Sequence, residues 1–319
     1  MKFWRLVTVL VVASGLTACR HHQHASPNVA AAQSMQIYNG VPDVSSQAVK
    51  ISNLYYVEKK RTSIEQTLDL YLPSNKQLEP FKVVIWIHGG SWLGGDKNSD
   101  VLPARLLSDR YAVASLDYRF SNEATFPAQI YDVKAAVRFL RANAAKYHLD
   151  PNRFAVWGTS AGGYLAAMLG TTGGVKSMEG SAGWANQSSR VQAVIDFCGP
   201  TDFNTAQSQA GPNNKIWFDA PGTAVYDLMG ARMDKDSLAS ASPVTYASKD
   251  DPPFLIMHGD LDDAIPPAQS QELYERLRDA GGTASYHLLR GYGHAFAAPE
   301  HLKLVQDFLA QALSKPEKH

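Results

Sequence analysis

The stretch over residues 153–170 constrains the fold of this chain more than any other part of it. An apolar run over residues 154–157 is typical of a buried strand, and an Ala-, Leu- and Met-rich run over residues 161–170 is typical of a helix. Between them lies the pentapeptide Gly-Thr-Ser-Ala-Gly that ends at Gly162. This pattern predicts a sharp strand-to-helix turn that exposes the hydroxyl of Ser160, with glycines where the backbone passes too closely for a side chain. A serine held in this way is suited to attack a carbonyl carbon.

From about residue 50 onward, strand-like and helix-like segments alternate. Such alternation predicts a mostly parallel sheet with helices on both faces, and two strands close together at the start predict an antiparallel edge. The expected strands are 51–57, 67–72, 82–88, 112–116, 153–157, 192–197, 253–258 and 283–289. The expected helices are 100–109, 127–146, 161–170, 223–230, 267–280 and 299–314, and in the second of these Ile130, Val133, Val137 and Leu140 recur at helical spacing.

A serine hydroxyl needs a base to become nucleophilic, and in this architecture the partners follow in the order serine, acid, histidine. Five histidines follow Ser160 in the chain. His258 and His287 lie at or inside predicted strands, His301 begins the last helix, and His319 is the terminal residue. His294 alone lies in a Gly-rich loop between a strand and a helix, where catalytic groups gather on open α/β sheets. We therefore expect His294 to be the base.

The acid has several candidates. Asp260, Asp262 and Asp263 all follow the strand predicted over residues 253–258, whereas Asp196 and Asp202 flank the end of an earlier strand. Asp260 is expected to cap the turn and Asp263 to face solvent, so we favour Asp262.

The oxyanion of an acyl-transfer intermediate needs backbone donors. The amide of Ala161 is one expected donor, because it directly follows the nucleophile. The small-residue loop that follows the strand over residues 82–88 offers Gly90 and Ser91 as the others.

Together these segments resemble the esterase and lipase group of the α/β-hydrolases, especially feruloyl-esterase-like, acetylxylan-esterase-like and kynurenine-formamidase-like enzymes. The resemblance covers roughly residues 50–314, and Ser91 stands where many relatives carry a third glycine. It rests on four segments that match the family's oxyanion loop, nucleophile turn, acid loop and base loop, namely His88-Gly-Gly-Ser-Trp92, Gly158-Thr-Ser-Ala-Gly162, His258-Gly-Asp-Leu-Asp262 and Gly291-Tyr-Gly-His294.

The resemblance implies a serine carboxylic-ester hydrolase that uses Ser160, Asp262 and His294, takes a small-molecule ester, and needs no metal or organic cofactor. Short-chain, aryl or sugar esters are the expected substrates, with Trp92, Tyr118 and Tyr292 as candidate pocket residues. Two alternatives are an amidase or peptidase of the same fold and a catalytically silent binding protein on this scaffold.

Charge argues against nucleic acid as a partner. Lys plus Arg and Asp plus Glu both number 30, and no basic stripe interrupts the sequence. A hydrophobic share of 45% over 319 residues suits one large domain. The other cysteine besides Cys19 is Cys198, which ends a predicted strand and is expected to serve as a small apolar residue.

The N-terminus predicts export. A short positive region and an apolar stretch precede Cys19, which directly follows Leu-Thr-Ala, as in bacterial lipoprotein signals. We expect a signal over residues 1–18, a lipidated Cys19 with a flexible tether over residues 19–48, and a catalytic domain over residues 49–319. Because residue 20 is not Asp, the resemblance implies the outer membrane, with periplasmic or secreted protein as the alternative.

Two long stretches, residues 171–190 and 203–242, interrupt the alternation of strands and helices. They are rich in Gly, Ser, Asn and Ala and contain several aromatic residues. We expect both to cross the carboxyl edge of the sheet, where they either form a small lid or use their aromatic side chains to pin long loops to the body.

Overall fold

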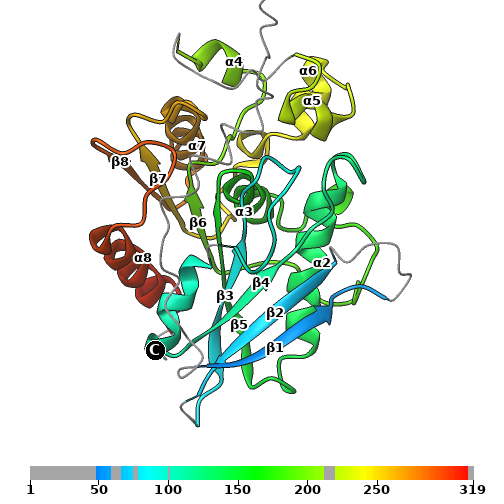
Figure 1. The fold of residues 1–319 in the computed structure, drawn as a ribbon, viewed down its shortest axis with the longest axis vertical. Coiled ribbons are helices and arrows are strands. Elements are labelled where there is room, and N and C mark those ends of the chain that lie inside the picture. Colours follow the sequence, from blue (N-terminus) through cyan, green and yellow to red (C-terminus); the bar gives the residue numbers. More distant parts are fainter. Residues whose placement is uncertain (1–47, 59–65, 75–77, 100, 212–219, 315–319) are drawn as a thin grey trace, which may run out of the picture.

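The structure, a computed structural model, describes residues 48–58, 66–74, 78–99, 101–211 and 220–314. Its centre is one eight-stranded sheet with the order β1-β2-β4-β3-β5-β6-β7-β8 (Figure 1). The strand β2 pairs antiparallel with both β1 and β4, and the remaining neighbours pair in parallel. The mostly parallel sheet and its antiparallel edge are therefore confirmed. The strands are β1 (Ala48–Tyr55), β2 (Thr67–Pro73), β3 (Phe81–Ile87), β4 (Tyr111–Leu116), β5 (Leu149–Thr159), β6 (Ala193–Phe197), β7 (Phe254–Gly259) and β8 (Ala284–Leu289).

The long helices fall where hydrophobic periodicity predicted them. Both α7 and α8 begin at a proline, a residue whose fixed φ and missing N–H suit the first helical position. The segment expected as a helix over residues 100–109 is a 3₁₀ helix, a form used for short pieces. The helices are η2 (Leu102–Asp109), α2 (Ala128–Ala142), α3 (Ala161–Thr171), η3 (Lys176–Met178), α4 (Ala206–Gln209), α5 (Ala224–Met229), α6 (Lys235–Ser240), η4 (Pro243–Tyr246), α7 (Pro267–Asp279) and α8 (Pro299–Ala312).

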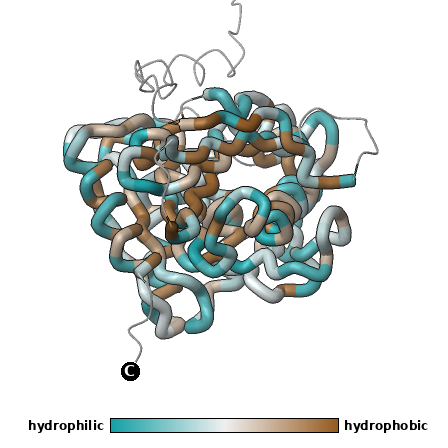
Figure 2. Tube along the Cα trace, turned by 90° about the horizontal axis from the view of Figure 1, so that it is seen from below, coloured by the Kyte–Doolittle hydropathy of each residue, from teal (hydrophilic) through white to brown (hydrophobic). Residues whose placement is uncertain are grey.

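Two hydrophobic layers enclose the sheet. One face packs against α2, α3 and α7, and the other packs against η2 and α8. The predicted sheet-facing stripe of α2 is fully buried, at Ile130, Val133, Val137 and Leu140. Hydrophobic segments accordingly run through the interior of the molecule, while hydrophilic segments gather at its periphery (Figure 2).

The described parts of the excursion over residues 203–242, residues 203–211 and 220–242, do lie beyond the carboxyl ends of the parallel strands. Its helices α5 and α6 lie side by side above that edge of the sheet, and α4 lies above it apart from them (Figure 1). Trp217 and Phe218, two aromatic residues of this stretch, lie outside the described residues.

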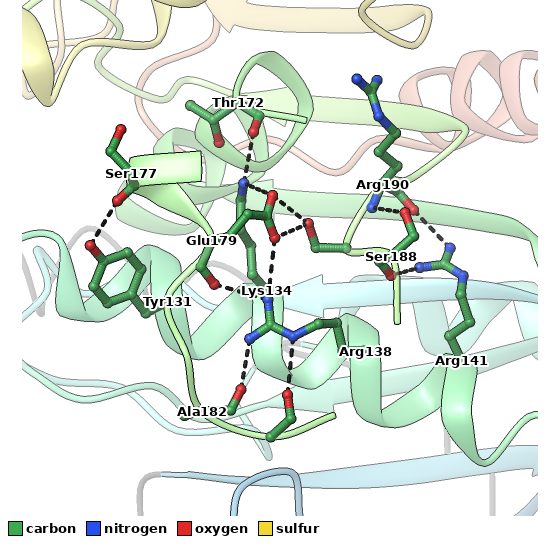
Figure 3. Close-up of polar contacts among 12 residues, drawn as sticks. Tyr131, Lys134, Arg138, Arg141, Thr172, Ser177, Glu179, Ala182, Ser188 and Arg190 are labelled. Carbon is green, nitrogen blue, oxygen red and sulfur yellow. Dashed lines mark hydrogen bonds and ion pairs between the residues drawn. The ribbon is translucent and has the colours of Figure 1, made fainter. Parts of the chain in front are cut away.

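The excursion over residues 171–190 takes a different course, and the expectation that it crosses the carboxyl edge was wrong. It packs along the outer side of α2, where Lys134 Nζ donates to Thr172 O at 2.7 Å and to Glu179 Oε1 at 2.8 Å (Figure 3). Trp184 packs against Phe139 of the same helix, with ring centroids 5.1 Å apart. An irregular segment has backbone carbonyls to satisfy, and the long cationic side chains of α2 supply the donors.

No helix within the described residues is long and apolar enough to cross a bilayer. The predicted signal over residues 1–18, Cys19, and all of the predicted tether except its last residue lie outside the described ranges.

Candidate active site

Ser160 lies on the predicted sharp turn between β5 and α3. Its backbone has φ 56° and ψ −122°, a conformation that is strained for any residue except glycine. A hydrogen bond of 2.8 Å from its amide to Phe197 O on β6 holds this turn. The flanking glycines are required by close packing, because a Cβ on Gly158 would lie 2.1 Å from Gly162 O and a Cβ on Gly162 would lie 2.1 Å from Ile87 O.

His294 connects this serine to an acid from a third loop. Its Nε2 lies 2.9 Å from Ser160 Oγ, and its Nδ1 lies 2.7 Å from Asp262 Oδ2. The network assigns the proton to Nδ1, because a carboxylate only accepts hydrogen bonds, and leaves Nε2 free to accept from the serine hydroxyl. The three residues follow β5, β7 and β8, whose carboxyl ends meet at one edge of the sheet.

The Asp262 carboxylate is buried and fully occupied by donors. Oδ1 accepts from the amides of Ala264 and Ile265 at 2.8 and 2.9 Å, while Oδ2 accepts from His294 and lies 3.0 Å from His258 Nε2. Burial would raise the pKa of this carboxyl, but the charge of His294 and the hydrogen bonds from both histidines outweigh it and hold the pKa well below its usual range. Asp262 is therefore ionised at neutral pH.

The environment of His294 favours its charged form. Burial by itself would lower the pKa of the imidazole, whereas the sulfur of Cys198 and the carboxylate of Asp262 raise it. The balance leaves the pKa of His294 well above 6.5, the usual value for histidine. The surroundings therefore stabilise the imidazolium that forms when Nε2 accepts a proton.

The other candidate acids have their own partners. Asp260 accepts a hydrogen bond of 2.7 Å from the amide of Gly291, so it joins the loop of Asp262 to the loop of His294. Asp196 accepts from the amide of Gly199 at 3.0 Å, and Asp202 accepts from the amide of Asn204 at 2.8 Å. The turn-capping role expected of Asp260 thus extends to the loop next to it.

The expected oxyanion loop follows β3. Gly90, Ser91 and Trp92 all have positive φ, at 109°, 57° and 58°, and Gly90 O accepts from the amides of Leu93 and Gly94. Among the described residues, the amides of Gly90 and Ser91 donate to no backbone carbonyl. Ala161 begins α3, so its amide has no partner within the helix. These amides remain available to a ligand oxygen.

Comparison with known proteins decides the family. A family model described as BD-FAE matches residues 68–277, which is more than half of the 319 residues and includes Ser160 and Asp262 but ends before His294. The chain belongs to the BD-FAE family.

Curated relatives of this BD-FAE protein include two from Mycobacterium tuberculosis. It is 31% identical over 237 residues to Esterase LipQ, covering 72% of this chain and 54% of LipQ. It is 30% identical over 248 residues to Esterase LipC, covering 76% of this chain and 60% of LipC. The chain thus spans little more than half the length of these relatives.

Solved structures agree on the α/β-hydrolase fold. A truncated form of a carbohydrate esterase from gut microbiota is 33% identical, with a TM-score of 0.77, and the match covers 86% of this chain and 99% of that one. Esterase B from Lactobacillus rhamnosis is 24% identical with a TM-score of 0.71, over 89% of this chain and 91% of that one. The second likeness speaks for the fold alone.

The three candidate pocket residues of this BD-FAE domain have different surroundings. Tyr118 has no exposed surface. Its ring stacks on His88 at 4.6 Å and its hydroxyl donates to His88 O, so it supports the start of the loop that carries Gly90 and Ser91. Trp92 is also buried, with its ring edge against Tyr164. Tyr292 lies two residues before His294 in the same loop and is half-exposed. Of the three, Tyr292 is the one that keeps substantial exposed surface, although its hydroxyl and ring contact Glu300 and His301 of α8.

Cys198 contacts the main chain of His294. Its thiol donates to His294 O at 3.3 Å, and its backbone takes a positive φ of 47°. Among the described residues, Cys198, Asp262 and His294 are the one group whose potential metal-ligand atoms all lie within 4.8 Å of one another. The donor and acceptor atoms of Asp262 and His294 are already paired within the site.

Sequence reasoning missed two buried polar residues of this site. His258 was interpreted as the end of a strand, yet it contacts Asp262, and Ser270 of α7 in turn contacts His258. The signal was present in the His-Gly-Asp-Leu-Asp segment, because His258 precedes the acid by four residues across a tight turn.

Proposed function

We propose that this BD-FAE protein is a serine carboxylic-ester hydrolase that acts through Ser160, His294 and Asp262. The observation that carries the proposal is the unbroken line of hydrogen bonds from Ser160 Oγ to His294 at 2.9 Å and from His294 to Asp262 at 2.7 Å. The esterase names of its relatives support the same reaction class.

In the first half-reaction, Ser160 Oγ attacks the ester carbonyl carbon while its proton passes to His294 Nε2. Asp262 holds the imidazole in orientation and stabilises the imidazolium that forms. The negative charge moves to the carbonyl oxygen, which the amides of Ala161, Gly90 and Ser91 stabilise. The tetrahedral intermediate then breaks its C–O bond to the alcohol, which leaves with the proton from His294, and an acyl-enzyme remains on Ser160.

In the second half-reaction, water takes the place of the serine hydroxyl. His294 Nε2 removes a proton from water as the oxygen attacks the acyl carbon. The intermediate collapses with cleavage of its bond to Ser160 Oγ, which recovers its proton from His294. The free acid leaves, and the protein returns to its starting state.

For the substrate we propose short-chain acyl or aryl esters of sugars. The relative that supports this is named as a carbohydrate esterase, and the match covers nearly all of its chain. Tyr292 is half-exposed in the same loop as His294, and we propose that its exposed surface contacts the sugar or aryl ring.

A fluorophosphonate probe combined with an ester panel tests both levels of the proposal. We expect the probe to label Ser160, and Ser160→Ala to lose labelling and about 10⁴–10⁶-fold in kcat. Ser108→Ala, which changes an exposed serine at the end of η2, is the matched control and should behave as the wild type. Failure of the wild type to label would favour a silent binding protein.

The ester panel runs from p-nitrophenyl acetate to the palmitate ester, followed by acetylated and feruloylated sugars and matching anilides. Preference for short acyl groups on sugars supports the substrate proposal. Preference for the palmitate ester overturns it in favour of a lipase, and faster anilide cleavage overturns it in favour of an amidase.

We also propose that Cys19 carries a lipid that anchors the protein in the bacterial envelope, in the outer membrane. Because the chain has two cysteines, Cys19→Ala and Cys198→Ala form a matched pair. With labelled palmitate supplied to cells, Cys19→Ala should lose the label and leave the membrane fraction, and Cys198→Ala should keep both. Equal palmitate labelling of the two variants would refute the proposal that Cys19 carries the lipid anchor.

A further inference from the structure

A second histidine contacts the same carboxylate oxygen of Asp262 as His294 does. His258, at the end of β7, places its Nε2 3.0 Å from Asp262 Oδ2, and its Nδ1 lies 2.7 Å from Ser270 Oγ on α7. Neither His258 nor Ser270 has exposed surface. This pair, which we term the buried arm, thus approaches Asp262 from the interior, whereas His294 approaches it from the site.

The hydrogen on His258 is assigned by its neighbours. Nε2 faces two acceptors, Asp262 Oδ2 and Ile265 O, both at 3.0 Å, so it carries a hydrogen. Nδ1 faces the Ser270 hydroxyl, which can donate to it. Both ring nitrogens are therefore satisfied with a single ring proton. Ser270 selects the tautomer that carries this proton on Nε2, where it is donated to Ile265 O with Asp262 Oδ2 equally close.

The result is a line of five side chains that is symmetrical about Asp262. From Ser160 through His294, Asp262 and His258 to Ser270, the contacts measure 2.9, 2.7, 3.0 and 2.7 Å. The end at Ser160 reaches the reaction centre, and the end at Ser270 is sealed in the core.

We propose that His258, oriented by Ser270, is a positioning residue that aligns the Asp262 carboxylate with His294 and shares the charge of its Oδ2 atom. The inference rests on the proposed esterase function. Two amides hold Oδ1 in place, whereas His294 is the one hydrogen-bond donor recorded for Oδ2. The buried ring of His258, 3.0 Å from Oδ2, restrains that oxygen from the core side, as outer hydrogen-bond partners do for metal-bound histidines.

Charge sharing predicts a direction for the pH profile. With His258 removed, the negative charge on Oδ2 is directed to His294 alone, which then holds its proton more tightly. The acid limb of kcat/KM therefore moves to higher pH. The other titratable groups that face this line are Cys198, which contacts His294, and Asp196, which interacts with His258.

The test compares His258→Leu, which removes the donor, with His258→Gln, whose amide nitrogen can reach toward Asp262 in place of Nε2. Active sites are counted with a fluorophosphonate so that kcat refers to folded protein. We expect His258→Leu to lose about 10–100-fold in kcat per active site with little change in KM. Its acid limb should move up by about one pH unit, and His258→Gln should restore most of both losses.

Ser270→Ala supplies a second, milder variant if His258→Leu does not fold. It should lower kcat per active site less than His258→Leu while moving the acid limb in the same direction. The deciding variant is His258→Leu, or Ser270→Ala if His258→Leu does not fold. If that variant keeps the wild-type kcat per active site and the wild-type acid limb, the buried arm is only part of the core and the proposal fails.

Proton NMR separates this proposal from the esterase function. A wild type that neither labels nor hydrolyses esters would refute the function, but the low-field Nδ1 proton of His294 still reports on its bond to Asp262. We expect that resonance to shift in Ser270→Ala and His258→Leu. An unshifted resonance would overturn the positioning role whatever the activity.

Discussion

Replacement of Glu179 by glutamine tests how the segment over residues 171–190 is held to the body. The Glu179 carboxylate lies 2.8 Å from Lys134 Nζ and 3.3 Å from Arg138 Nη1, and both cations lie on α2 (Figure 3). The side chain of Lys134 is 0% exposed and that of Glu179 is 29% exposed. Glu179→Gln keeps the shape of the side chain and removes the single anion that faces both cations.

The cost follows from that burial. Removal of one partner from a buried ion pair costs about 3–5 kcal/mol, because the remaining charge stays desolvated. The partial exposure of Glu179 places the expected loss at the lower end, about 3 kcal/mol. For a domain of this size that corresponds to a fall in Tm of about 6 °C. None of these residues contacts Ser160, Asp262 or His294, so kcat at low temperature should stay unchanged.

The loss should also depend on pH. Burial already lowers the pKa of Lys134 from its usual 10.5, and loss of the nearby carboxylate lowers it further. A lysine whose folded-state pKa lies below its unfolded-state pKa destabilises fully below the folded value, and the penalty disappears as pH rises toward the unfolded value. The Tm difference between wild type and Glu179→Gln should therefore shrink between neutral pH and about pH 10.

Thermal unfolding monitored by circular dichroism across that pH range measures both effects. Glu275→Gln makes the same chemical change at an exposed position of α7, and should move the free energy of unfolding by less than about 0.5 kcal/mol. In a Lys134→Met background, Glu179→Gln should lower the free energy of unfolding by less than in the wild type. The reason is that, of the two cations on α2, only Arg138 then remains to lose its contact with Glu179. A Tm fall equal to that of the control, or one that is constant with pH, would refute the reasoning.

Three further predictions concern the site. The acid limb of kcat/KM should have its midpoint above pH 6.5, because the pKa of His294 is raised, and a midpoint below that value would contradict this assignment. Asp262→Asn should lower kcat by about 10⁴-fold and Asp263→Asn by less than tenfold, measured on p-nitrophenyl acetate; the reverse order would move the acid. Burial raises the pKa of Asp196 to about 6, and its Oδ2 has no hydrogen-bond partner among the described residues. Near pH 8 the buried charge destabilises the folded state, so Asp196→Asn should raise Tm by a few degrees. Because an Asp with a raised folded-state pKa regains stability as pH falls, this gain should vanish near pH 4, and thermal scans at both pH values check it.

Much of the architecture could be predicted because its signals are local. The expected strands and long helices agree with the structure to within a few residues, since alternation and helical spacing of apolar side chains depend on neighbours in the chain. The turn at Ser160 could be predicted for the same reason: the glycines that its packing requires lie two residues to either side. Local sequence could not reveal that residues 171–190 pack along α2, because that course depends on cations about 45 positions away.

The candidate site also has features that local sequence predicts and features that it does not. Chain order and loop position selected Ser160, Asp262 and His294, and the structure brings these side chains into contact, although their catalytic role stays a prediction. Tyr118 was expected to face a ligand and is instead fully buried, because the composition of a loop does not tell which side of it faces the core.

The sequence by itself determined the order of strands and helices, the strained serine turn and the residues that could complete a triad. Tertiary structure alone decided that His258 and Ser270 stand behind Asp262, and that Cys198 lies against the main chain of His294. The physical reason is distance along the chain. Periodicity and turn chemistry act over a few residues, whereas these contacts exist because parallel strands bring the loops at their carboxyl ends to one edge of the sheet.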